Sequence, residues 1–157
     1  MAYQAKVWYF AYGSNLNVDQ MRKLVGQWAL SKRAVARNFK LVFNVYSNQR
    51  KGYIVNMQES ANFEDIVPGV VYHLTQEQLH ALQKFDGIPP TDIRVELEDG
   101  NEISHAEAFI WKTNEKDHLP AKEYLRTIEQ GLVQHGYPEA RARSILARFE
   151  KGAQAVK

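Results

Sequence analysis

Residues 9–16, Tyr-Phe-Ala-Tyr-Gly-Ser-Asn-Leu, constrain the fold more than any other stretch of this chain. The apolar and aromatic run over residues 7–10 is typical of a buried strand. Gly13, Ser14 and Asn15 then favour a turn, and Asn17 with Gln20 predicts a helix N-cap and its returning partner. Such a joint leaves backbone N–H groups pointing outward, which suits a carboxylate or an oxyanion, although an ordinary strand–turn–helix connection has the same pattern.

The rest of the chain is rich in strands and closes with helices. Alternating apolar residues predict strands near residues 28–37, 39–46, 52–57, 70–74, 93–97 and 103–111. Thr75 and Gln78 form a capping box before a helix whose core-facing stripe is Leu79, Leu82 and Phe85. Two further helices are expected from Pro120 to Gly136 and from Pro138 to Phe149. The pattern predicts an α+β fold with a mixed or mostly antiparallel sheet, for which a closed barrel is one arrangement.

Length and composition favour a single domain over residues 1–150, with a frayed tail over residues 151–157. The chain has no cysteine and no apolar run of membrane-spanning length. We therefore expect a cytoplasmic protein that neither forms disulfides nor enters a membrane. The five histidines are scattered and no phosphate-binding glycine loop is present, so we expect no metal and no nucleotide cofactor.

The charge is unevenly distributed along the chain. Residues 22–51 contain eight basic and no acidic residues, whereas residues 86–107 contain seven acidic residues and one arginine. A basic stretch of this kind is one feature of a nucleic-acid-binding surface. However, the net charge is only +2 and the basic residues alternate with apolar ones, which favours strands of opposite charge that pair across a sheet. We expect no nucleic-acid partner.

Asp86 is a candidate for proton transfer. It follows Phe85 at the C-terminal end of a predicted helix, where the helix dipole destabilises a negative charge. In a partly apolar pocket the pKa of this carboxyl is expected to rise, which suits a general base. The alternative is that Asp86 and Gly87 form only a turn dipeptide.

Three segments carry a family resemblance. Residues 9–16 resemble the signature loop of the γ-glutamylcyclotransferase family. Residues 82–87, Leu-Gln-Lys-Phe-Asp-Gly, resemble the segment of the family's catalytic acid, whose typical pattern is Leu-Asp-x-x-Glu-Gly. Residues 120–128 resemble the late helix that supplies a pocket tyrosine. Their order and spacing agree with the family from about residue 7 to residue 146.

The resemblance implies a small mixed, mostly antiparallel β-barrel with flanking helices. It also implies release of 5-oxoproline from a γ-glutamyl amino acid or γ-glutamyl amine, by attack of the substrate's own α-amino group and without a cofactor. The implied catalytic acid and base is Asp86. The residues expected to bind this small-molecule substrate are Tyr12, Gly13, Ser14, Asn15, Leu16 and Tyr124.

At two positions the chain departs from the family pattern. Asp86 stands where the family typically has glutamate, and Gln83 stands where it often has aspartate. The Asp86 side chain is one methylene shorter, and a displacement of about 1 Å costs on the order of 100-fold in rate. The alternative hypothesis is therefore a weakened enzyme or a non-catalytic protein of the same fold that binds a γ-glutamyl ligand. The sequence leaves the oligomeric state and the leaving amine open.

Overall fold

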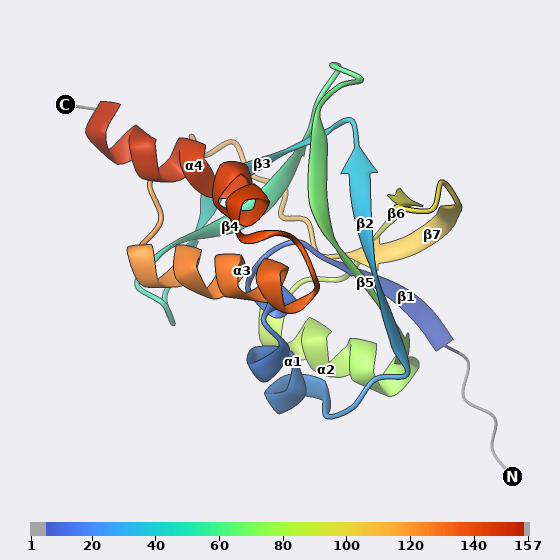
Figure 1. Ribbon diagram of the computed structural model, residues 1–157. Coiled ribbons are helices and arrows are strands. Elements are labelled where there is room, and N and C mark those ends of the chain that lie inside the picture. The colour runs from blue at the N-terminus through green and yellow to red at the C-terminus, as the bar shows by residue number, and fades with distance from the viewer. Residues whose placement is uncertain (1–5, 156–157) are drawn as a thin grey trace, which may run out of the picture.

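Five strands close into a small barrel in the computed structural model, which describes residues 6–155 and the side chains of residues 6–150 (Figure 1). Around the barrel the strands are β1 (Lys6–Ala11), β5 (Ile66–Thr75), β2 (Leu30–Arg37), β6 (Thr91–Leu97) and β7 (Glu102–Ala108). Neighbouring strands are antiparallel, except that β7 pairs with β1 in parallel and thereby closes the ring. The predicted α+β fold with a mixed, mostly antiparallel barrel is confirmed.

The core lies inside the barrel and between the barrel and its helices. β1 pairs over its whole length with the second part of β5, from Lys6 opposite Thr75 to Ala11 opposite Val70. The second half of β1 and most of β5 are buried, because one face of each strand points into the barrel and the other is covered. Residues 9–11 of the signature octet belong to β1, which therefore leads directly into residues 12–16, the part of the octet that we call the signature loop.

A separate hairpin stands beside the barrel. It consists of β3 (Phe39–Ser47) and β4 (Gly52–Glu59), which pair with each other and with no barrel strand. The register shifts between Val42 and Val45, where the hairpin bulges. At its tip the Ser47 hydroxyl accepts a hydrogen bond from the Arg50 backbone N–H at 3.2 Å, so the turn between the strands has a defined shape.

The helices lie on the outside of the barrel (Figure 1). They are η1 (Ser14–Leu16), α1 (Val18–Val25), α2 (Gln76–Asp86), α3 (Lys122–Gln134) and α4 (Glu139–Ala155). Asn17 caps α1 as predicted, and the Thr75–Gln78 capping box begins α2. Gly87, at φ 78°, ends α2 in the left-handed conformation that glycine adopts without strain.

The prediction for Gln20 is wrong. Its side chain does not return to the backbone N–H of Asn17, which instead donates to the carbonyl oxygen of Ser14 at 2.9 Å. The Gln20 amide donates to the Ser14 hydroxyl at 2.7 Å and to the Asn15 side-chain oxygen at 2.8 Å. The Gln20 side chain therefore binds the signature loop, whereas the capping pattern predicted that it would bind the backbone at the start of α1.

The predicted pairing of opposite charges across the sheet is present between β2 and β6. Arg37 contacts Glu96 through two hydrogen bonds of 2.8 and 3.0 Å. Arg33 lies 2.7 Å from Glu98. Two cations of the basic stretch are thus neutralised by the acidic one, as expected for neighbouring strands.

Only part of the predicted frayed tail can be compared with the structure. The backbone of α4 continues as a helix to Ala155, and residues 156–157 lie outside the described part of the chain. No helix within residues 6–155 has the length and apolar character needed to cross a membrane.

Candidate active site

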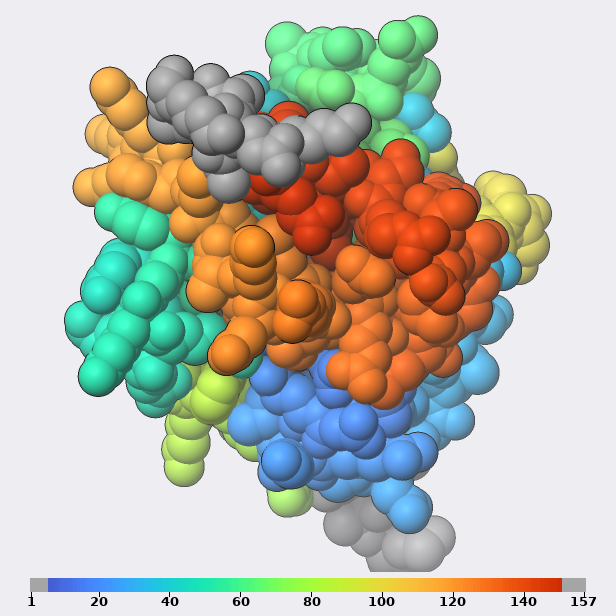
Figure 2. All heavy atoms as spheres, turned by 60° about the vertical axis from the view of Figure 1, so that its left-hand side comes forward, coloured from blue at the N-terminus to red at the C-terminus, as the bar shows by residue number. Residues whose placement is uncertain are grey.

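A cavity of about 300 Å³ opens between the barrel, the β3–β4 hairpin and the start of α3. In Figure 2 the hairpin tip lies beside α3 on one face of the molecule, with the end of α2 below them. Segments that are far apart in the sequence therefore form one wall. Apart from the signature loop, the lining includes Tyr9, Val45, Tyr46, Ser47, Asn48, Gln49, Arg50, Ile54, Val55, Phe85, Asp86, Phe109, Trp111 and Tyr124.

The signature loop is packed tightly against the hairpin and α3. A Cβ atom on Gly13 would lie 2.5 Å from the Val55 Cγ1 atom, so only glycine fits between the loop and β4. On the other side the Asn17 amide contacts α3, donating to the Gln130 side chain at 3.2 Å. The backbone N–H groups of Ser14 and Asn15 belong to the first turn of η1 and have no acceptor within that turn.

Buried hydrogen bonds fix the orientation of the loop from below. The Asn15 side-chain amide donates to the Tyr9 hydroxyl at 2.8 Å. The Tyr72 hydroxyl donates to the Asn15 carbonyl oxygen at 2.9 Å and also contacts the His135 Nε2 atom at 2.8 Å. Since Tyr9, Tyr72 and His135 are held by β1, β5 and the C-terminal cap of α3, the loop is preorganised before any ligand arrives.

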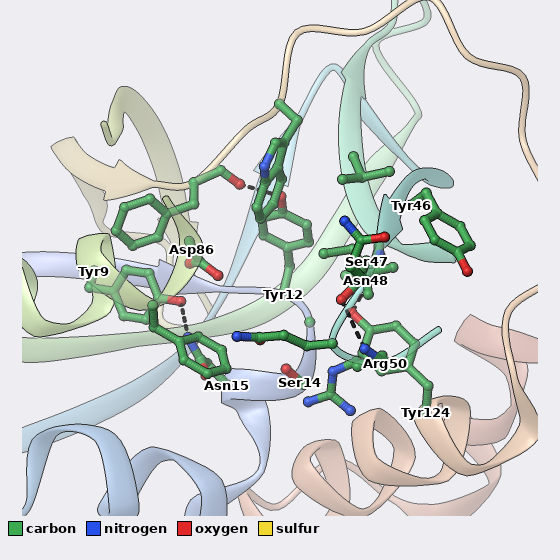
Figure 3. Close-up of a pocket in the computed structure, with 18 residues that line it drawn as sticks. Tyr9, Tyr12, Ser14, Asn15, Tyr46, Ser47, Asn48, Arg50, Asp86 and Tyr124 are labelled. Carbon is green, nitrogen blue, oxygen red and sulfur yellow. Dashed lines mark hydrogen bonds between the residues drawn. The ribbon is translucent and has the colours of Figure 1, made fainter. Parts of the chain in front are cut away.

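Asp86 is the last residue of α2 and extends into the cavity between Tyr9 and Tyr12 (Figure 3). Burial raises the pKa of its carboxyl group from 3.8 to about 7. Its charge in turn contributes to the raised pKa of Tyr9, after the larger effect of burial. The rise expected for this position is therefore present, with desolvation as its main cause. A carboxylate with a pKa near neutrality exchanges protons readily at physiological pH.

The tyrosine hydroxyls around Asp86 differ in what they can offer a ligand. The Tyr124 hydroxyl accepts a hydrogen bond from the Val55 backbone N–H at 3.1 Å, which leaves its own hydrogen free to donate. Burial raises the pKa of Tyr124 to about 12, so this hydrogen is retained. The Tyr12 hydroxyl donates to the Phe109 carbonyl oxygen, and its hydrogen is therefore already used.

Residues 9–126 match the family model described as gamma-glutamyl cyclotransferase, AIG2-like. The chain belongs to this family. Gamma-glutamylcyclotransferases from Bos taurus and Homo sapiens are 29% and 27% identical to it, each over a 139-residue alignment that covers 83% of this chain and 72% of the relative. The family and these relatives support a function of the gamma-glutamylcyclotransferase type.

Solved structures agree with this assignment. One gamma-glutamyl cyclotransferase superposes with a TM-score of 0.81 at 26% identity, covering 91% of this chain and 88% of that chain. YkqA from Bacillus subtilis has a TM-score of 0.80 at 22% identity, covering 94% of this chain and 55% of that chain, and shows the shared fold alone.

The structure brings together most of the site residues that the sequence predicted. Asp86 and Tyr124 line the cavity with four residues of the family's signature loop, which are Tyr12, Gly13, Ser14 and Asn15. Leu16 does not line it. Its side chain is fully buried in the core, and its backbone N–H donates to the Gly13 carbonyl oxygen at 3.0 Å. The loop therefore offers fewer free N–H groups than its sequence implied.

Phe85 corrects another prediction. It was placed on the core-facing stripe of α2, but 41% of its surface is exposed and it lies at the cavity. Leu79 and Leu82 are buried as predicted. The final turn of α2 extends past the core, and Phe85 and Asp86 both reach the cavity there.

Several lining residues were not predicted. Arg50 belongs to the basic stretch, which the sequence assigns to strands that pair with acidic ones. Trp111 is expected within a strand over residues 103–111, but β7 ends at Ala108 and Trp111 follows it in a loop. Tyr9 lies inside the signature octet, but its side chain had been assigned only to the strand. Nothing local in the sequence marks Arg50, because its place in the cavity depends on how the hairpin docks beside the barrel.

Proposed function

We propose that this protein is a γ-glutamylcyclotransferase that releases 5-oxoproline from a γ-glutamyl amino acid or γ-glutamyl amine. The observation that carries the proposal is the Asp86 carboxyl group. It has a pKa of about 7 and lies in the same cavity as Ser14 and Asn15 of the family's signature loop. A proton-exchanging carboxylate beside an anion-binding loop is what an internal acyl transfer requires.

The reaction begins at the substrate's α-ammonium group. Ionised Asp86 accepts a proton from this nitrogen, which then attacks the γ-carbonyl carbon and closes a five-membered ring. Asp86 returns this proton to the leaving nitrogen, and the tetrahedral intermediate collapses as the bond to that nitrogen breaks. The ring nitrogen then loses its second proton to Asp86, which passes it to the departing amine. Overall, two protons pass from the attacking nitrogen to the departing ammonium. Holding the substrate folded supplies much of the rate through proximity.

The remaining lining residues hold the substrate in this folded shape. The N–H groups of Ser14 and Asn15 bind its α-carboxylate, as expected for the first turn of a helix. The Tyr124 hydroxyl, whose hydrogen is free, donates to the oxygen of the γ-carbonyl as negative charge develops there. Tyr12 shapes the pocket with its ring, since its hydroxyl is bound to Phe109.

The proposal is tested by measuring 5-oxoproline release from a panel of γ-glutamyl dipeptides and γ-glutamyl amines. Asp86→Asn is expected to abolish release and to leave the protein folded. Asp86→Glu restores the usual family residue and is expected to retain or increase release. Asp92→Asn is the matched control, because Asp92 lies outside this cavity and contacts the exposed His105. Release that survives in Asp86→Asn would remove Asp86 from the mechanism.

A second candidate is supported by the aspartate at position 86. If the shorter side chain does not reach the substrate nitrogen, the protein binds a γ-glutamyl ligand without turning it over. This candidate predicts thermal stabilisation by the ligand with no 5-oxoproline release from the native protein, and a gain of release in Asp86→Glu.

A further inference from the structure

Arg50 is the charged residue that the proposed mechanism leaves without a role. Of the 18 residues lining the cavity, only Arg50 and Asp86 carry a charged side chain. Figure 3 shows them on opposite sides, Asp86 beside Tyr9 and Arg50 beside Tyr124. Arg50 comes from the hairpin and is positively charged, whereas Asp86 comes from α2 and is negatively charged when ionised. The cavity therefore has a basic side and an acidic side.

Several contacts hold the Arg50 side chain at the cavity. One guanidinium nitrogen donates to the Gln20 side-chain oxygen at 2.8 Å, and Gln20 in turn donates to Ser14 and Asn15. The guanidinium carbon lies 4.8 Å from the centre of the Tyr124 ring, within reach of a cation–π interaction. The guanidinium is thereby linked to the signature loop and to the tyrosine proposed as a donor.

The charge of Arg50 has no acidic counterpart within the described residues. The ion pairs among the described residues involve other arginines and two histidines, and the Arg50 guanidinium has one hydrogen bond, to Gln20, and one cation–π contact, with Tyr124. A guanidinium has five N–H donors in a planar fork that matches a carboxylate. Most of these donors are left for a ligand.

Substrate chemistry indicates what that ligand group is. The glutamyl part of any γ-glutamyl substrate carries one α-carboxylate and one α-ammonium, which the signature loop and Asp86 are proposed to bind. A γ-glutamyl amino acid has a second carboxylate on its leaving amine, whereas a γ-glutamyl amine has none. The unpaired cation, which lies across the cavity from Asp86, is complementary to this second carboxylate.

We infer that Arg50 recognises an anionic group on the leaving amine, so that the protein discriminates γ-glutamyl amino acids from γ-glutamyl amines. The inference rests on the proposed function, because it assumes that the γ-glutamyl part occupies the Asp86 end. Arg50 acts as a specificity residue and takes no part in proton transfer. A charge-assisted pair of this kind favours the carboxylated substrate by about 10- to 100-fold.

The experiment compares γ-glutamyl-alanine with γ-glutamyl-ethylamine, which differ only in the carboxylate of the leaving amine. The native protein is expected to have a kcat/KM ratio of about 10 to 100 in favour of the alanine derivative. In Arg50→Met this ratio is expected to fall to within about threefold of unity. Arg50→Glu is expected to prefer γ-glutamyl-1,3-diaminopropane, whose leaving amine carries a positive charge.

Lys51→Met is the matched control. Lys51 is the next residue of the same hairpin tip and is exposed, but it does not line the cavity. Its removal lowers the net charge by the same amount and is expected to keep the preference. An equal loss of preference in Lys51→Met, an unchanged ratio in Arg50→Met, or a native ratio near unity would overturn the inference.

A binding measurement separates this inference from the proposed function. Asp86→Asn is expected not to convert the ligand, so binding can be measured at equilibrium. Calorimetry gives the affinity of both compounds for Asp86→Asn and for the double variant Asp86→Asn/Arg50→Met. Affinity that favours the alanine derivative and depends on Arg50 supports the inference even if no variant releases 5-oxoproline. Release without any charge preference leaves the proposed function standing and overturns the role of Arg50. Failure to bind either compound overturns the inference.

Discussion

At the scale of single residues, Asp86 determines how activity depends on pH. The mechanism needs the ionised form, and burial raises the pKa of this carboxyl to about 7. We therefore expect kcat/KM to rise about tenfold per pH unit up to this value and to level off between about pH 7 and 8. Initial rates of 5-oxoproline release across this range measure the midpoint. A midpoint near 4, the ordinary value of an exposed aspartate, would contradict the assignment.

The proposed role of Tyr124 as a hydrogen-bond donor is tested by removing its hydroxyl group. Tyr124→Phe removes a hydrogen that is free to donate, and it also leaves the buried Val55 N–H without its acceptor. We expect kcat to fall by about 10²- to 10³-fold and the free energy of unfolding to fall by about 1–3 kcal/mol. Rates and denaturant melts measure the two effects separately.

Tyr137→Phe is the control for Tyr124→Phe. Tyr137 is equally buried, and its hydroxyl donates to the Gly69 carbonyl oxygen at 2.8 Å, outside the cavity. A similar loss of stability with unchanged kcat is expected there. If both variants lose kcat to the same degree, the effect of Tyr124 is structural and its role as a donor is wrong.

At the scale of secondary-structure elements, α3 both carries Tyr124 and supports the signature loop. Gly131 allows the close contact, because a Cβ atom there would lie 2.4 Å from the Leu16 carbonyl carbon and 2.5 Å from the Asn17 nitrogen. Gly131→Ala forces the helix and the loop apart, so we expect a loss of about 1–3 kcal/mol in the free energy of unfolding, together with reduced kcat/KM.

Val133→Ala provides the comparison for Gly131→Ala. Val133 lies on the same helix with 41% of its surface exposed, and its truncation is expected to change stability and rate only slightly. Chemical denaturation and rates of 5-oxoproline release cover both variants. Wild-type stability in Gly131→Ala would show that the loop has room to move, against the packing described.

The sequence predicted these elements well where the signal is local. The Asn17 cap, the Thr75–Gln78 capping box and the Gly87 helix end each depend on contacts within about four residues, and all three are present. Gln20 was misplaced because its side-chain N–H groups donate to Ser14 and Asn15, and the Arg50 guanidinium competes with the Asn17 N–H for its side-chain oxygen. That competition arises only once the loop has folded.

The sequence could not predict that Arg50 and Trp111 line the cavity, for a different reason. Arg50 and Trp111 both line the cavity because the hairpin docks against the loop that follows β7, where the Asn56 side-chain amide binds both the N–H and the carbonyl oxygen of Trp111. Such contacts join positions about 55 residues apart and leave no periodic pattern. The family resemblance supplied Asp86 and the loop, whereas the hairpin wall had to come from the structure.

At the scale of the whole molecule, the site is expected to reduce stability. Because the pKa of Asp86 is raised from 3.8 to about 7, the folded protein binds more protons than the unfolded chain between these values. The free energy of unfolding therefore falls as the pH rises through this window, and the loss is complete above it. Asp86→Asn removes the titrating group and is expected to melt at a higher temperature than the native protein at pH 8.

Melting temperatures of both proteins from pH 4 to pH 8 test this expectation. The native curve is expected to fall relative to that of Asp86→Asn as pH increases, so that the variant is inactive but more stable. Parallel curves would mean that the Asp86 carboxyl titrates alike in the folded and unfolded states, and the raised pKa would then be wrong.

The structure also shows where three cations of the basic stretch over residues 22–51 lie. Arg33 and Arg37 of the basic stretch pair with Glu98 and Glu96, and Arg50 lies at the cavity, so these cations do not form one continuous surface for phosphates. A cytoplasmic location and the absence of a nucleic-acid partner stay predictions.

The β3–β4 hairpin forms a two-stranded sheet of its own, and this independence has an evolutionary consequence. Its tip can be lengthened, shortened or recoded without breaking any strand pair of the barrel, because turns at the surface tolerate such changes. Asp86 belongs to α2, and the signature loop follows β1 in the chain, so neither is part of the hairpin. Descendants of this fold are therefore free to exchange one departing amine for another while inheriting the ring-closing chemistry unchanged.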